Sequence, residues 1–212
     1  MRDRHTPCSP SVERPSAPNL GAEMLIAHLP ASYLCTRVLQ RRLGKQLLPL
    51  GLLASVLPDI DLLYFYLVDG RAHPHHTYWT HLPVAWVLLA SLGSVLTLWE
   101  RRLHEAMLVF FSNILLHLAL DTVAGGICWL YPLSVRSVQL ISVPAAHGHW
   151  LLSFVHHWSF LLELAIGVAA LAVWGLAIAR AASGRARGAD PAPRPRIRSS
   201  TDLSIFKIAH RG

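Results

Sequence analysis

Apolar residues along this 212-residue chain gather into four long blocks separated by short polar segments. The hydrocarbon core of a bilayer is about 30 Å thick, and an α-helix needs about 20 residues to cross it. Each block approaches that length, so the pattern predicts about four transmembrane helices, over residues 46–68, 82–99, 106–130 and 160–178. The predicted fold class is therefore all-α, a polytopic helical bundle in a membrane.

The segments that flank these blocks have different patterns. Residues 24–43 are amphipathic and too short to span comfortably, which predicts an interfacial or re-entrant helix. Residues 1–23 are rich in proline, serine and charge, and residues 180–212 are basic and rich in proline, so both are predicted to be disordered. The embedded domain is then 24–179.

The composition agrees with this pattern, and the position of the charged residues indicates what they contact. Hydrophobic residues make up 53% of the chain and charged residues 15%, whereas a soluble domain typically has about a quarter charged residues. Most of the net charge of +7 lies in the tail that follows the last apolar block. A basic tail at that place is typical of contact with lipid headgroups. We expect membrane lipids as partners and no nucleic acid.

The distribution of arginine and lysine predicts the orientation. Basic residues precede the first block, lie between the second and third, and follow the fourth, whereas connections 69–81 and 131–159 contain one arginine each. The positive-inside rule then places both termini in the cytoplasm and the histidine-rich connections on the outer face.

Ionisable residues within the apolar blocks are the candidates for chemistry, because each is costly in a membrane and usually has a partner. His117 and Asp121 form an HxxxD pair in the third block, and four residues along a helix place both on one face, with Asn113 one turn earlier. This spacing suits one metal ion, and it equally suits a hydrogen bond that only holds helices together.

Pro58, Asp59, Ile60 and Asp61 interrupt the first block. Proline predicts a helix break there. Two carboxylates with no neighbouring lysine or arginine repel each other unless they are protonated or bind a cation. One aspartate could instead cap a helix, which leaves the second unexplained.

Histidines crowd two connections. His76 and His81 lie in the segment HPHHTYWTHLP, and neutral imidazole is a common ligand of zinc and similar ions. A pH-sensitive loop at headgroup level is the alternative. His28, on the apolar face of the first short helix, is a candidate because of its company. A second group could provide ligands, protein contacts or proton carriers: His147, His149, His156, His157 and Glu163. The cysteines show no CxxC spacing, so we expect nitrogen and oxygen ligands.

The order of these motifs resembles a known family. His28, PDID at 58–61, HxxxxH from His76 to His81, and HLALD from His117 to Asp121 followed by WLYPLS are similar to a bacterial family of inner-membrane, metal-dependent hydrolases. That family was formerly a domain of unknown function and is sometimes labelled LexA-binding. The likeness covers about residues 24–178. Where its second motif often reads HRGxTHS, this chain has HTYWTHL, so both histidines match and the arginine does not. A looser similarity is to zinc-dependent phospholipases C.

The resemblance implies a hydrolase of the bacterial cytoplasmic membrane that acts on an ester or phosphoester. The predicted position of the site, in the outer half of the bilayer, favours a lipid or lipid-linked substrate. The resemblance also implies a divalent metal ion, zinc first and manganese or iron as alternatives, with these ligands: His28, Asp59, Asp61, His76, His81, His117 and Asp121. Asp59 or Asp61 is also the predicted general base. The competing interpretations are a structural metal site, an ion or proton pathway, a docking role for a partner, and a family member that has lost catalysis.

Overall fold

The structure, a computed structural model, describes residues 26–43, 46–70, 75–144 and 150–188. Apart from isolated bridge residues, such as the pair Ile127 and Val138, all regular elements in these ranges are helices, which confirms the all-α prediction. They are α1 His28–Leu43, α2 Leu48–Val56, η1 Pro58–Ile60, α3 Asp61–Leu67, η2 His75–Thr77, η3 Trp79–His81, α4 Pro83–Leu96, α5 Arg101–Ala124, α6 Trp150–Val155 and α7 Ser159–Gly188.

Two helices in the described ranges are long and apolar enough to cross a membrane, namely α5 and the Ser159–Gly184 part of α7. A third span exists if α2 and the following segment Pro58–Leu67, bent by 46°, form one broken span. The block at 82–99 gives only the 14 residues of α4, a length of about 21 Å. Four spans are therefore not confirmed.

The predicted break at Pro58 is confirmed. Helix α2 ends at Val56, and a 3-10 turn, η1, joins it to α3. Proline has no N–H to continue the helical hydrogen bonds, and its ring crowds the preceding turn. The consequence is a bend that separates Asp59 from the helices on either side.

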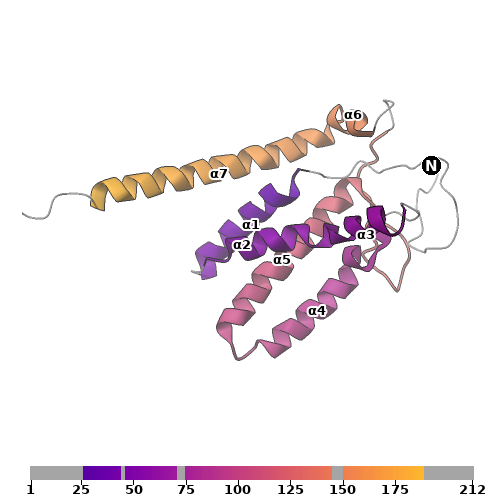
Figure 1. Ribbon diagram of the computed structural model, residues 1–212, viewed down its shortest axis with the longest axis horizontal. Coiled ribbons are helices and arrows are strands. Elements are labelled where there is room, and N and C mark those ends of the chain that lie inside the picture. The colour runs from indigo at the N-terminus through magenta and orange to yellow at the C-terminus, as the bar shows by residue number, and fades with distance from the viewer. Residues whose placement is uncertain (1–25, 44–45, 71–74, 145–149, 189–212) are drawn as a thin grey trace, which may run out of the picture. The chain divides into compact units, whose positions relative to one another are not determined.

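Helix α5 is central and packs against α1, α2 and α4. Helices α4 and α5 form an antiparallel hairpin (Figure 1). Helix α1 turns its polar side inward: His28, Ser32, Thr36 and Gln40, each four residues apart, are buried. The large apolar residues Leu29 and Val38 are about half exposed. An amphipathic helix in water shows the opposite arrangement, so this one suits an apolar environment.

A glycine permits the close approach of α2 to α1 and α5. A Cβ atom on Gly51 would lie 2.0 Å from Thr36 Oγ1 and 3.0 Å from Asn113 Nδ2. Any larger residue would push these helices apart. This close packing fixes where α2 ends relative to α1 and α5, and therefore the position of the η1 turn.

The described residues divide into two units between Trp174 and Gly175. The first contains α1 to α6 and the beginning of α7, and the second contains the remainder of α7. Because α7 continues to Gly188, residues 180–188 of the predicted disordered tail are helical; alanine and arginine, which are frequent there, favour helix. The disorder predicted for 1–23 and for the rest of the tail lies outside the described residues.

Candidate metal centre

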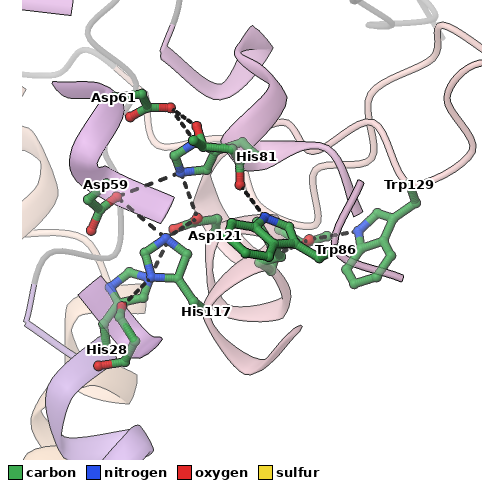
Figure 2. Close-up of polar contacts among 12 residues, drawn as sticks. His28, Asp59, Asp61, His81, Trp86, His117, Asp121 and Trp129 are labelled. Atoms are coloured by element: carbon green, nitrogen blue, oxygen red, sulfur yellow. Dashed lines mark hydrogen bonds and ion pairs between the residues drawn. The ribbon is translucent and has the colours of Figure 1, made fainter. Parts of the chain in front are cut away.

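Four separate segments bring polar side chains together at the C-terminal part of α5 (Figure 2). Helix α1 provides His28 and turn η1 provides Asp59. Turn η3 provides His81, and α5 provides His117 and Asp121. The convergence that the sequence predicts for these five residues is therefore present, at the place where α2 breaks.

His117 and Asp121 form the base of the cluster. They lie one turn apart on α5, and His117 Nε2 is 3.1 Å from Asp121 Oδ2. The other oxygen of Asp121, Oδ1, is 3.0 Å from His28 Nε2. The His28 and His117 rings pack with their centroids 4.1 Å apart. The HxxxD spacing thus places both groups on one buried face, and His28 joins them from α1.

Asp59 closes the cluster from the η1 turn. Its Oδ1 lies 3.4 Å from His117 Nε2 and 3.6 Å from His81 Nε2. The Asp59 side chain is 34% exposed, whereas the side chains of His81 and His117 are fully buried. Asp59 is therefore where the cluster opens to its surroundings.

His81 lies between two carboxylates (Figure 2). Its Nδ1 is 2.7 Å from Asp61 Oδ2, and its Nε2 is 3.5 Å from Asp121 Oδ2. The Thr80 hydroxyl donates a hydrogen bond to the same oxygen of Asp61. Burial opposes protonation of His81, but hydrogen bonds to Asp59 and Asp61 outweigh it and raise the pKa of His81 to about 9. Asp61 thus contacts the side of the imidazole that faces away from the centre of the cluster.

The Nδ1 atoms of both central histidines are engaged, which fixes their ring orientation. His117 Nδ1 donates to the carbonyl oxygen of Ser55 at 2.7 Å. That carbonyl is available because α2 ends one residue later, at Val56, and the last carbonyls of a helix have no partner within it. With Nδ1 as the donor, the lone pair of neutral histidine lies on Nε2, which faces the cluster.

Two buried atoms at the centre make no hydrogen bond: His117 Nε2 and Asp121 Oδ2. Buried polar atoms are almost always hydrogen-bonded, and an exception needs a reason. A lone pair and a carboxylate oxygen that face each other repel unless a cation or a proton lies between them. These two atoms therefore fit the requirement of a bound cation.

Overlapping groups of residues could hold such a cation, each with its ligand atoms within 4.8 Å of one another: His28, His117 and Asp121; Asp59, His81 and His117; His76, His81 and Asp121. Nitrogen and carboxylate oxygen together suit zinc and similar divalent ions. Among the described residues, each ion pair of these carboxylates is with a histidine. No lysine or arginine in those ranges therefore neutralises these carboxylates as a metal cation would.

Six of the seven predicted ligands thus fall in these groups, and Asp61 instead supports His81. Sequence reasoning did not find the contributions of Ser55 and Thr80. The Ser55 carbonyl could have been anticipated, because the break at Pro58 ends the helix just after it.

The second histidine group does not join the cluster within the part of the chain that is described. His156 Nδ1 donates to the Leu152 carbonyl, and His157 contacts Ser159. Glu163 accepts a hydrogen bond from the Ile26 backbone N–H at 3.0 Å, which ties α7 to the start of α1. His156 lies in the turn after α6, and Glu163 lies on α7, so the two do not share one helix face. His147 and His149 lie outside the described residues.

Comparison with known proteins gives one positive result. A family model described as YdjM inner membrane protein matches residues 24–187. Neither a curated protein nor a solved structure matches the chain. The match supports the family predicted from the motifs, and it does not extend to hydrolase activity or to the similarity with phospholipase C.

Proposed function

The chain belongs to the YdjM inner membrane protein family, and from this premise we propose that it is a metal-dependent hydrolase of the bacterial cytoplasmic membrane. The observation that carries the proposal is the pair of buried atoms without hydrogen bonds, His117 Nε2 and Asp121 Oδ2, beside a partly exposed carboxylate, Asp59. Such a set can hold a cation and also move a proton.

The chain's own residues divide the work. His117 and Asp121 would hold a cation together with further imidazoles of the cluster, and zinc is the first choice for these ligands. A bound divalent cation lowers the pKa of water from about 15.7 towards about 7 and polarises an ester or phosphoester oxygen. Asp59 Oδ1, at the opening of the cluster, accepts the proton of the attacking water. Asp61 holds the His81 ring in place through Nδ1.

The surroundings of Asp59 support a lipid or lipid-linked substrate. The next residue in η1, Ile60, is 54% exposed, and Leu63 on the following turn is 61% exposed. Large apolar side chains beside the opening favour contact with acyl chains over contact with water. A headgroup ester can then reach Asp59 while its chains remain in the bilayer.

The test uses purified protein in detergent, loaded with zinc and mixed with vesicles that contain phospholipids. Mass spectrometry would detect free fatty acid if a carboxylic ester is cleaved, and a released phosphorylated headgroup or phosphatidic acid if a phosphoester is cleaved. We expect release by the wild type and by Glu100→Gln, a carboxylate control at the opposite end of α5, and none by Asp59→Asn or Asp121→Asn. The proposal fails if every variant releases as much product as the wild type does.

A structural metal centre is the second candidate. The full burial of His81 and His117 favours it, because structural sites are closed whereas catalytic sites keep an open position. A chelator distinguishes the two. If the metal is structural, its removal lowers the thermal midpoint by many degrees and no product forms under any condition.

We further propose that both termini lie in the cytoplasm and that the metal centre faces the outer half of the bilayer. The basic residues Arg101 and Arg102, at the end of α5 far from the cluster, support this orientation. A reporter enzyme fused after Gly212 should behave as cytoplasmic. Periplasmic activity of that fusion would reverse the C-terminal assignment.

A further inference from the structure

We propose that the cluster binds two divalent cations and that Asp121 bridges them. This inference rests on the proposed metal centre and adds the number of ions and the role of each ligand. One cation would be held by His28, His117 and Asp121. The other would be held by His76, His81 and Asp121.

Each of the two central imidazoles, those of His81 and His117, can bind only one ion. His117 Nδ1 is hydrogen-bonded to the Ser55 carbonyl, and His81 Nδ1 is hydrogen-bonded to Asp61. Only the Nε2 atoms of these two rings face the cluster. A nitrogen lone pair coordinates a single cation, so two groups that share a histidine cannot be filled together.

This limit selects among the three groups. The group of Asp59, His81 and His117 shares a histidine with each of the others, so it excludes both. The remaining two groups share only Asp121. They can therefore be filled at once, and together they use four different imidazoles.

Asp121 has the geometry for the shared position. Its Oδ1 is 3.0 Å from His28 Nε2, while its Oδ2 is 3.1 Å from His117 Nε2 and 3.5 Å from His81 Nε2. Both oxygens therefore face imidazole nitrogens, and the side chain is 3% exposed. The Asp121 carboxylate therefore lies within reach of imidazoles from both groups, as a ligand shared by two ions requires.

The packing of His76 supports its place in the second group. Helix α5 ends at Ala124, and a Cβ atom on Gly125 would lie 2.3 Å from His76 Cε1 and 2.8 Å from His76 Nδ1. The ring therefore rests directly on the glycine backbone after α5. Its centroid is 5.0 Å from that of His81.

Two consequences follow for the chemistry. Asp59 belongs to neither filled group, which leaves it to accept a proton. Two cations carry four positive charges against three negative charges of Asp59, Asp61 and Asp121, so the centre has a net charge of about +1 with neutral imidazoles. In a nonpolar setting this charge favours an anionic substrate, and a pair of metal ions suits displacement at phosphorus. The substrate class is therefore a phosphoester.

The experiment is a count of zinc per chain by elemental analysis of the full-length protein, purified in detergent and equilibrated with zinc. We expect two equivalents in the wild type and in Asp59→Asn, and one in His28→Ala and in His76→Ala. His156→Ala, which removes an exposed histidine outside the cluster, should retain two. One equivalent in the wild type, or loss of an ion from Asp59→Asn, overturns the inference and leaves the proposed metal centre standing. A wild type without zinc overturns both.

A second measurement needs no variant. Wild-type protein loaded with Mn²⁺ should give the electron paramagnetic resonance spectrum of two coupled ions. An isolated six-line signal at full loading overturns the bridge, because ions that share a carboxylate interact magnetically.

Discussion

Two stretches of the same face of α5 differ in how fully their buried polar atoms are hydrogen-bonded. Asn113 and the pair His117 and Asp121 follow one another at four-residue spacing, and all three are buried. Asn113 is saturated: its Nδ2 donates to Thr36 Oγ1 and to the Val109 carbonyl, and Ser32 Oγ lies 2.7 Å from its Oδ1. One turn later, His117 Nε2 and Asp121 Oδ2 make no hydrogen bond.

The difference separates a structural polar group from a ligand. A satisfied buried amide stabilises the packing of α1 on α5, and its removal costs stability. An unsatisfied buried pair destabilises the fold by itself, so it needs something that binds to it. Burial alone does not identify a site; here two buried atoms without hydrogen bonds face each other beside a partly exposed carboxylate, and this combination points to one.

The largest expected effect is that of Asp121→Ala. This change removes the residue shared by two of the three ligand groups, so we expect zinc binding to weaken by more than about 100-fold. Titration with zinc against a competing chelator measures it. Glu100→Gln is the matched control, since it removes a carboxylate from the far end of α5 and should bind zinc like the wild type.

Asp61→Asn should have an intermediate effect, because it disturbs the support of a ligand and leaves the ligand itself. Partners that orient metal-binding histidines are typically worth about 10- to 100-fold in affinity. The same titration measures the change. Affinity equal to that of the wild type would show that Asp61 does not orient His81.

Acid should weaken binding gradually. In the metal-free protein the pKa of His81 is about 9, so below that pH the imidazole carries a proton that the cation must displace. Apparent affinity should rise by about tenfold per pH unit towards 9 and then level off. An apparent zinc affinity that does not change between pH 6 and 8 would show that His81 is not a ligand.

The smallest effect on the metal should come from Asn113→Ala. We expect zinc binding to be unchanged and the free energy of unfolding to fall by about 1–3 kcal/mol, because Ser32 and Thr36 each lose a hydrogen bond to Asn113. Thermal unfolding in detergent measures the loss. Loss of zinc at unchanged stability would contradict this prediction, because Asn113 would then take part in binding the metal.

The sequence predicted six residues that the structure brings together, and it predicted the helix break beside them. The HxxxD spacing placed His117 and Asp121 on one face, and Pro58 predicted the bend that presents Asp59. The number of spans could not be settled in this way, because hydropathy does not show that α4 begins only at Pro83 and ends at Leu96. The role of Asp61 was equally out of reach, since it depends on a contact with His81 across 20 positions of the chain.

The most direct test compares bound zinc in His117→Ala and Asn113→Ala, purified side by side and analysed for metal. We expect His117→Ala to hold less zinc than the wild type, while Asn113→Ala retains as much as the wild type. Equal zinc in the two variants would contradict this expectation, because the atoms left without hydrogen bonds would then have no part in binding a metal.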